Sequence, residues 1–352
     1  MSEAAADASA TGAVQRQAWA DAVLPPVEQV RPGLWSIPVP IPINSLRYVL
    51  VYAFEVPDGV AIVDAGWDTD EAWTALTQGL GKAGYDASDV TAVMVTHIHP
   101  DHYGLADRVR EASGAWVGLH PADAALLPTR YDDVEFLLAE MRKLLVHCGV
   151  PDAELAELTS ASMGIREFVR QAEPDRLIED GDRLALHGWD LRAIWTPGHS
   201  PGHLCFAEPD RRLVLTGDCV LPRISPNISI HPQQGGNPLA EFLDSLAGLH
   251  LLDVDEVLPA HEYRFTGLQR RIDALARHHR DRLDEIVRLV TESPGATCWE
   301  LTTRLHWSRP WQEVASFMRR AANGETLAHL VMLASTGRVR SQPGPVTRWW
   351  PT

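Results

Sequence analysis

The chain has 352 residues, of which 45% are hydrophobic and 22% charged, and its formal net charge at pH 7 is −16. This composition is ordinary for a soluble globular protein, and the length allows one large domain and a smaller second one. No apolar run reaches the roughly 18 residues that a bilayer-spanning helix needs, which excludes a protein anchored by such a helix.

Residues 1–25 predict a flexible tail with a short helix from Val14 to Val23. This tail is rich in alanine and serine and lacks the basic start and apolar core of a signal peptide. The four cysteines are widely spaced and include no CxxC pair, which favours a reducing compartment over a disulfide framework. We therefore expect a cytoplasmic protein that does not associate with a membrane.

The next part of the chain alternates between strand and helix patterns. Apolar residues at helical spacing predict a helix from Asp70 to Ala83, and a second one over residues 104–112. Runs rich in β-branched and aromatic residues predict strands at Leu34–Val39, Leu46–Phe54, Val60–Val63, Val90–Val95 and Trp116–Leu119.

The most informative segment follows the strand Val90–Val95 and reads Thr-His-Ile-His-Pro-Asp-His over residues 96–102. Its imidazoles at His97, His99 and His102 and the carboxylate of Asp101 are four potential metal ligands within six residues. Such donors suit borderline first-row cations, zinc above all. Strand alternation places His97 and His99 on one side of the strand end, whereas Asp101 and His102 fall on the following turn and can face a second ion.

Residues 122–172 interrupt the strand–helix alternation. Val134–His147 and Asp152–Arg170 have helical apolar spacing, with Val150-Pro151 as the break between them. This helical insertion has two open interpretations, a lid over a metal cleft or structural packing alone.

Three later strands each end in a further potential ligand, and another helix is predicted at Pro238–Leu249. The ligands are His199 after the strand Leu191–Trp195, Asp218 after Leu213–Thr216 and His261 after Val257–Pro259. A single histidine after a strand is weak evidence for a site. The order of all these elements favours one shared site, because two metals need more than four protein donors.

With these motifs in this order, residues 30 to 265 resemble the metallo-β-lactamase-fold hydrolase superfamily. The resemblance implies an α/β fold, an αββα sandwich with metals at one edge of the paired sheets, and a catalytic domain over residues 26–268. It also implies a structural role for Asp64 in Ile-Val-Asp-Ala-Gly. By the same resemblance, His97, His99 and His199 would hold one metal, Asp101, His102 and His261 the other, and Asp218 would bridge the two.

These ligands predict a hydrolase with two divalent metal ions, zinc in the first place, with manganese or iron as alternatives. A water between the two ions would lose its proton near neutral pH, and the resulting hydroxide would attack an acyl carbon. Asp101 and Asp218 are the predicted catalytic carboxylates. The expected partner is a small ester, thioester or lactone.

Five residues are candidate contacts to substrate: Tyr263, Arg264, Arg223, Asn227 and His231. The first two follow the last ligand histidine, in a His-Glu-Tyr stretch that resembles the equivalent stretch of glyoxalase II hydrolases. They can equally continue a loop and pair with nearby acids. The other three lie in a proline-containing loop after Asp218.

Residues 269–352 change character to helices without ligand motifs. The predicted helices are Ile272–Thr291, Thr297–Leu305, Trp311–Asn323 and Thr326–Ser335, followed by a turn into a short strand at 336–340. This order resembles the winged-helix-like tail of some superfamily hydrolases and endoribonucleases.

Charge separates this tail from the rest of the chain. From residue 265 onward, 13 arginines and no lysine stand against eight acidic residues, a net charge of +5, whereas residues 1–264 have −21. The basic tail keeps nucleic acid as a second candidate partner, with cleavage of single-stranded RNA as the alternative function. The acidic catalytic part favours the small acyl substrate, because it would repel nucleic acid at the cleft.

Overall fold

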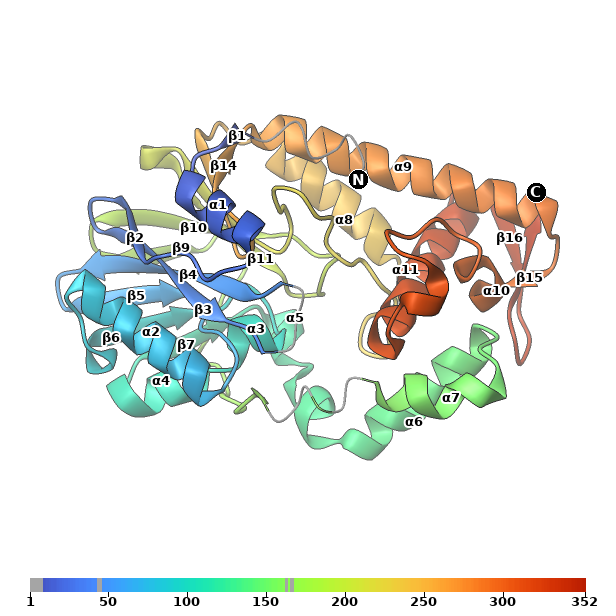
Figure 1. Cartoon of the computed structure of the whole chain (residues 1–352), viewed down its shortest axis with the longest axis horizontal. Helices are drawn as coiled ribbons and strands as arrows, with labels where there is room; N and C mark the ends of the chain where they lie inside the picture. Colours follow the sequence, from blue (N-terminus) through green and yellow to red (C-terminus); the bar gives the residue numbers. More distant parts are fainter. Residues whose placement is uncertain (1–8, 43–45, 162–163, 165–167) are drawn as a thin grey trace.

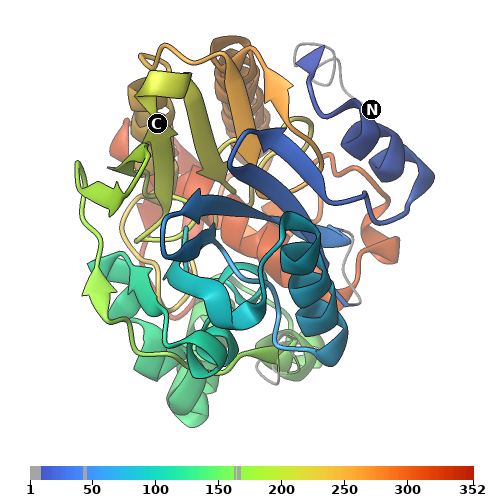
Figure 2. The same cartoon turned by 90° about the vertical axis from the view of Figure 1, so that its left-hand side faces the viewer.

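A computed structural model describes residues 9–42, 46–161, 164 and 168–352 of the chain. Two seven-stranded sheets pack face to face, and helices cover their outer faces (Figures 1 and 2). The αββα arrangement expected from the sequence is therefore confirmed. A smaller three-stranded sheet belongs to the C-terminal region.

The first sheet is built from the N-terminal half of the chain. Its strands, in spatial order, are β2 (Glu28–Arg31), β3 (Leu34–Pro40), β4 (Tyr48–Val56), β5 (Gly59–Val63), β6 (Val90–Met94), β7 (Trp116–Leu119) and β8 (Arg176–Leu177). It is antiparallel from β2 to β5 and parallel from β5 to β8. The helices α2 (Asp70–Ala83) and α4 (Ala106–Ser113) bury their apolar sides against its outer face. The side chain of Thr69 caps α2 by accepting a hydrogen bond from the N–H of Ala72.

The second sheet comes mainly from the second half of the chain. Its strands, in spatial order, are β1 (Ser9–Ala10), β14 (Phe265–Thr266), β13 (Glu256–Pro259), β12 (Leu213–Gly217), β11 (Leu204–Glu208), β10 (Trp189–Trp195) and β9 (Arg183–Leu186). Only the pair β12–β13 is parallel among its described strands. The helices α8 (Pro238–Leu249) and α9 (Leu268–Glu292) lie on its outer side and share one apolar core with it. A second core, rich in tyrosine, phenylalanine and leucine from both sheets, fills the space between the sheets.

The described part of the N-terminal segment is packed onto the sandwich. β1 pairs with β14, and α1 (Ala13–Asp21) follows it. The buried side chain of Gln15 donates to Ser36 Oγ at 3.0 Å, and Trp19 packs edge-on against Tyr48. The predicted short helix is present as α1, and its apolar and amide side chains find partners on the strands. Residues 1–8 of the predicted tail lie outside the described part of the chain.

The insertion forms α5 (Pro121–Ala124), a single π-helical turn η3 (Pro128–Asp132), α6 (Val134–His147) and α7 (Asp152–Ser160). α7 is shorter than predicted, and residues 162–163 and 165–167 of that prediction lie outside the described residues. α6 and α7 contribute to the same core as the C-terminal helices. Backbone hydrogen bonds from Trp299 N to the carbonyl of Cys148 and from Thr347 N to the carbonyl of His147 join the two regions.

The C-terminal region continues from α9 through β15 (Ala296–Thr297), α10 (Cys298–Thr302), α11 (Ser316–Ser335), β16 (Val339–Gln342) and β17 (Arg348–Pro351). Its antiparallel sheet has the order β15–β17–β16. The two helices predicted at 311–323 and 326–335 are one helix, α11, preceded by a short 3-10 turn at Trp311–Glu313. Gly324 does not break α11, because it keeps a helical backbone and packs against another segment. No helix in the described part of the chain is long and apolar enough to cross a membrane.

Candidate metal centre

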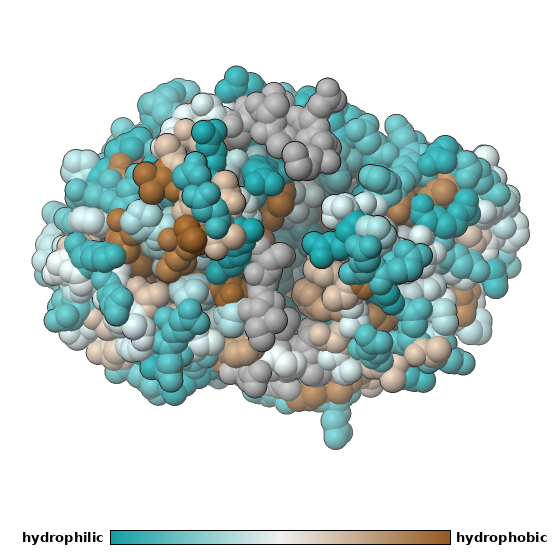
Figure 3. Space-filling model, in the orientation of Figure 1, coloured by the Kyte–Doolittle hydropathy of each residue, from teal (hydrophilic) through white to brown (hydrophobic). Residues whose placement is uncertain are grey.

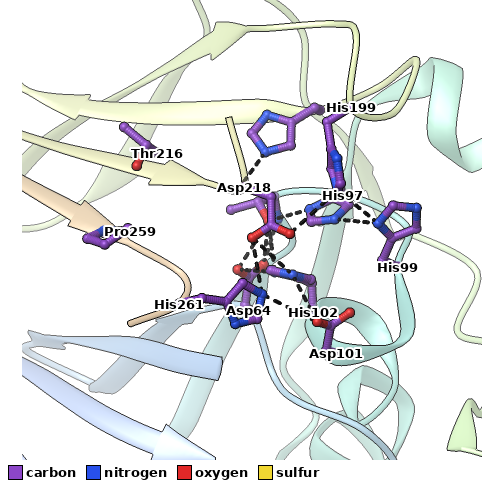
Figure 4. Close-up of polar contacts among 12 residues, drawn as sticks. Asp64, His97, His99, Asp101, His102, His199, Thr216, Asp218, Pro259 and His261 are labelled. Carbon is purple, nitrogen blue, oxygen red and sulfur yellow. Dashed lines mark hydrogen bonds and ion pairs between the residues drawn. The ribbon is translucent and has the colours of Figure 1, made fainter. Parts of the chain in front are cut away.

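The carboxyl ends of four strands bring the predicted ligands to one edge of the sandwich (Figure 4). β6 leads to His97 and His99, and β10 leads to His199. β12 ends beside Asp218 and β13 beside His261; these two strands run parallel, so their ends meet at the same edge. Residues far apart in sequence therefore converge because each one terminates a strand.

The short helix α3 (Pro100–Tyr103) separates the ligands of the first motif into two sets. Pro100 takes the first helical position, where its missing N–H removes no helical hydrogen bond. His99 precedes the helix, whereas Asp101 and His102 lie in its single turn. One motif of six residues can thus face two positions.

The first group of donor atoms comprises three histidines. Nδ1 of His99 lies 2.9 Å from Nε2 of His97 and 3.0 Å from Nε2 of His199. Their candidate ligand atoms all lie within 4.8 Å of one another. Oδ2 of Asp218 lies 3.5 Å from Nε2 of His199, at the side of this group.

The second group comprises Asp101, His102 and His261, also with ligand atoms within 4.8 Å of one another. Oδ2 of Asp101 lies 3.6 Å from Nε2 of His102 and 3.4 Å from Nε2 of His261. The other oxygen of Asp218, Oδ1, lies 3.2 Å from Nε2 of His261 and 3.6 Å from Nε2 of His102. The carboxylate of Asp218 therefore lies between the two groups and directs one oxygen to each.

Unpaired polar atoms inside the cluster test whether these residues fit a metal. Nε2 of His102, Nε2 of His261 and Oδ1 of Asp218 are buried and have no hydrogen-bond partner among the described residues. Burying such atoms without a partner costs free energy. Imidazole nitrogens and carboxylate oxygens are the donors that zinc and similar cations prefer. The residues therefore fit a divalent cation.

The protein surroundings shift the acidity of these groups strongly. Burial, together with the neighbouring His102 and His99, lowers the pKa of His97 well below its ordinary value. Burial acts in the same direction on His102, but the carboxylates of Asp64 and Asp101 outweigh it and raise the pKa of His102 to about 9. Burial disfavours the charged form of Asp218, yet the nearby histidines hold its pKa well below the usual range. A bound cation would replace the protons that the histidines otherwise hold.

Partners behind the ligands fix the orientation of their rings. Asp64, which has a left-handed backbone (φ 63°), accepts a hydrogen bond from Thr96 N at 2.8 Å and pairs with Nδ1 of His102 at 2.8 Å. Nδ1 of His261 lies 2.8 Å from the carbonyl oxygen of Tyr48, and Nδ1 of His199 lies 2.9 Å from that of Asn227. In each ring the remaining nitrogen, Nε2, is turned to the cluster, which is the usual arrangement of metal-ligating histidines.

Two buried acids near the cluster were missed by the sequence analysis. Asp123 accepts hydrogen bonds from Ile98 N, Ser200 Oγ and Gly202 N at 2.7–2.9 Å. It thereby ties the loop after β6 to the loop after β10. The signal was present, because Asp123 follows the strand Trp116–Leu119 in the way that the ligands follow theirs.

Glu262 is the second missed acid, and it is fully buried. One of its carboxylate oxygens accepts a hydrogen bond from Arg223 N at 3.0 Å. The residue after His261 therefore anchors the start of the loop that follows Asp218.

The five predicted substrate contacts are found in different places. Asn227 and His231 lie in the loop beside His199, and the carbonyl of Asn227 contacts that histidine. Arg223 is partly exposed and faces Glu262.

The structure does not bring Tyr263 or Arg264 to the cluster. Tyr263 is buried in the core between the sheets. The guanidinium of Arg264 is buried against two acids, Glu256 at 2.5 Å and Glu28 at 2.7 Å.

Comparison with known proteins gives a family for this fold and site. The family model described as the metallo-beta-lactamase superfamily matches residues 45–261. A curated relative, the probable metallo-hydrolase YqjP of Bacillus subtilis (strain 168), is 27% identical over 312 residues, which are 87% of this chain and 93% of that protein.

Solved structures extend the similarity to the C-terminal region. The metallo-beta-lactamase family protein TTHA1429 from Thermus thermophilus is 30% identical with a TM-score of 0.79, covering 92% of this chain and all of that one. A beta-lactamase domain protein from Burkholderia ambifaria is 25% identical with a TM-score of 0.82, and each chain is covered completely. The chain belongs to the metallo-β-lactamase superfamily.

Proposed function

We propose that the protein is a hydrolase that uses two divalent cations, zinc in the first place, to cleave a small ester, thioester or lactone. This proposal rests on the position of Asp218. Its Oδ2 faces the first group of donor atoms and its Oδ1 faces the second. Manganese or iron would suit the same nitrogen and oxygen donors. We assign one cation to His97, His99 and His199 and the other to Asp101, His102 and His261.

The protein groups around these positions provide what hydrolysis requires. When bound, two such cations lower the pKa of water towards neutrality and offset negative charge that develops on the substrate. Asp218 contacts histidines of both sets and Asp101 contacts His102 and His261, so we assign to these two carboxylates the acceptance of the proton that water loses. Asp64 and the carbonyls behind the rings keep the histidines oriented.

The fold of the C-terminal region favours a small acyl substrate over RNA. Its order of helices and strands agrees with a winged-helix-like unit, which we propose for residues 269–352. In the third helix of that unit, α11, the buried residues lie from Ala322 to Leu333, and several of them belong to the core shared with α8 and α9. This part of the helix offers little surface to nucleic acid. Cleavage of single-stranded RNA remains the alternative that the basic tail supports.

The proposal is tested by removing ligands. We expect His97→Ala and Asp218→Ala to lose bound metal and activity together, because each removes a donor from the cluster. Metal content is measured by plasma mass spectrometry, and activity on panels of esters, thioesters and lactones and on single-stranded RNA. His187→Ala, at a turn away from the ligand cluster, is the matched control and should keep both. Full activity in a metal-depleted variant would overturn the mechanism, and turnover of RNA alone would replace the acyl substrate.

A further inference from the structure

Two arginines approach the metal centre from separate parts of the chain. Arg130 lies in η3, at the start of the insertion, and Arg320 lies in α11 of the C-terminal region. The next residue in η3, Tyr131, donates its hydroxyl to the carbonyl of Ile98 at 2.8 Å, between the ligands His97 and His99. This contact places η3 directly against the first metal-ligand motif.

The loop after Asp218 connects η3 with the other side of the centre. Nη1 of Arg130 donates to Oε1 of Gln233 at 3.3 Å, and Nε2 of Gln233 donates to Thr129 Oγ1 at 2.9 Å. The adjacent Gln234 donates from Nε2 to the carbonyl of Gly198 at 2.7 Å, next to the ligand His199. Residues 233 and 234 thus bridge η3 and the loop after β10.

The same loop is held by α11 through its backbone. Ser229 Oγ donates to the carbonyl of Ala321 at 3.2 Å, and Ile230 N donates to the carbonyl of Gly324 at 3.1 Å. Arg320 directly precedes Ala321, so it lies where α11 meets this loop. The surface is hollowed between the sandwich and the C-terminal helices (Figure 3).

Neither guanidinium forms an ion pair with an acid within the described residues, unlike that of Arg264, which faces Glu256 and Glu28. Nη1 of Arg320 is buried without a hydrogen-bond partner among them, and its closest aromatic neighbour is Phe317, with the guanidinium carbon 5.7 Å from the ring centre. Asp123 lies within electrostatic reach of Arg130, but its oxygens are occupied by Ile98, Ser200 and Gly202. By contrast Arg319, one residue earlier in α11, faces Glu154 at 3.5 Å.

The charge of Arg130 acts on Arg320, and the charges of both arginines act on His231. Burial, and then the positive charge of Arg130, lower the pKa of Arg320 to about 10. Burial lowers the pKa of His231 to about 3, and both arginines add to this effect. Arg320 therefore stays protonated at neutral pH although the positive charge of Arg130 acts on it. Holding two such cations partly out of water without an anion is unfavourable, and a bound anion would relieve it.

We propose that Arg130 and Arg320 together bind a carboxylate or phosphate group of the substrate, beside the part of the metal centre formed by His99 and His199. This inference rests on the proposed hydrolysis and narrows its substrate to an acyl compound with an acidic group away from the scissile bond. Guanidinium groups suit this task because their planar N–H donors match the oxygens of carboxylate and phosphate. The net charge of −16 describes the whole chain, whereas Arg130 and Arg320 place two positive charges at this position.

The first experiment measures anion binding to the full chain after its metal has been removed, with circular dichroism as the check on folding. The probes are glutarate and inorganic phosphate, and their binding is measured by calorimetry or NMR. We expect at least one of them to bind, and Arg130→Gln and Arg320→Gln to weaken that binding by about tenfold, as for the loss of one charged hydrogen-bonding partner. Arg320→Lys, which retains the charge, should weaken binding less. Arg319→Gln, the matched control on α11, should leave it unchanged.

The second experiment compares metal-loaded enzymes on aryl esters whose acyl chains end in a methyl, a carboxylate or a phosphate group. The wild-type enzyme should have a higher kcat/KM for an ester that ends in an acidic group than for the methyl-terminated ester. Arg320→Gln should lower kcat/KM for the acidic ester by about tenfold. The same variant should change kcat/KM for the methyl-terminated ester by less than about twofold.

Each outcome bears on one proposal or the other. Absence of anion binding, or binding that both glutamine variants retain, overturns the arginine subsite even if neutral esters are hydrolysed. Binding that depends on both arginines, in an enzyme that cleaves none of the acyl substrates, supports the subsite and contradicts the proposed function. Equal loss in Arg319→Gln would show a general charge effect and would also overturn the subsite.

Discussion

At the scale of single residues, Asp123 joins the loop after β6 to the loop after β10 with three hydrogen bonds. Its carboxylate accepts hydrogen bonds from Ile98 N on one loop and from Ser200 Oγ and Gly202 N on the other. The first loop carries His97 and His99, and the second follows His199. The relative positions of these three histidines therefore depend on a residue that is not itself in any of the ligand groups.

We expect Asp123→Asn to lower the affinity for the cation by about 10–100-fold, as replacing partners behind metal ligands usually does. The NH₂ group of the new asparagine cannot accept a hydrogen bond. At least one of the three groups that donate to Asp123 would therefore face another donor. The dissociation constant is measured by competition with a chromogenic chelator. Asp133→Asn is the control, since Asp133 is an exposed cap of α6 that asparagine can replace. Unchanged cation affinity in Asp123→Asn would show that the two loops hold their positions without this carboxylate.

At the scale of secondary structure elements, α11 connects the C-terminal region to the loop beside the metal centre. Gly324 permits this contact, because a Cβ built at this position would lie 2.8 Å from the carbonyl oxygen of Ile230 and 3.1 Å from Cβ of Ser229. Glycine is otherwise unfavourable within a helix by about 1 kcal/mol relative to alanine. The close approach of helix and loop gives a reason for a glycine here.

We expect Gly324→Ala to destabilise the protein by about 1–3 kcal/mol, because overpacking against the backbone of Ile230 outweighs the gain in helix propensity. Gly81→Ala in α2 is the matched control, since nothing lies within 4 Å of the position that its added methyl group would take. A gain of about 0.5–1 kcal/mol is expected there. Urea unfolding measures both. If Gly324→Ala stabilised the protein as much as Gly81→Ala, the contact between α11 and the loop would not be tight.

At the scale of the whole molecule, one apolar core joins the second sheet, the insertion and the C-terminal region. It contains Leu145 of α6, Phe242 of α8, Leu275 of α9 and Leu330 of α11. The insertion and the C-terminal region are therefore parts of one packed unit with the sandwich. Ionisable side chains enclosed in this unit make its stability depend on pH.

Glu325 of α11 provides such a dependence. Burial raises its pKa to about 7 from 4.5, an effect that the charge of Arg282 only partly offsets. Below pH 4.5 the side chain is protonated in both the folded and unfolded states. Between pH 4.5 and 7 the unfolded state loses the proton while the folded state keeps it, so stability falls as the pH rises through this window.

We therefore expect Glu325→Gln to stabilise the protein relative to wild type by about 2–3 kcal/mol more at pH 8 than at pH 5, since each unit of pKa shift corresponds to about 1.4 kcal/mol. Urea unfolding of both proteins at each pH cancels contributions from other groups. Glu313→Gln, at an exposed position, should show no such difference. An equal effect at both pH values would mean that Glu325 is ionised in the folded state.

The sequence by itself determined the superfamily, the sandwich and the seven candidate ligands. This was possible because five of the ligands follow the ends of strands and the other two lie in the turn after one of them, and strand patterns and turn residues are local signals in the sequence. The prediction of a helix break at Asn323-Gly324 was wrong because it also relied on a local signal. The sequence alone does not distinguish a glycine that ends a helix from one that allows a neighbouring segment to approach closely.

Only the tertiary structure decided which charged side chains meet. Arg264 follows a ligand histidine in sequence, yet it is buried against Glu256 and Glu28. Arg130 and Arg320 lie far apart in the chain and look like ordinary arginines on helical segments, yet packing of α11 and η3 on one loop leaves both near His231 without an acid. Charge pairing depends on distances across the fold, and no local pattern in the sequence encodes those distances.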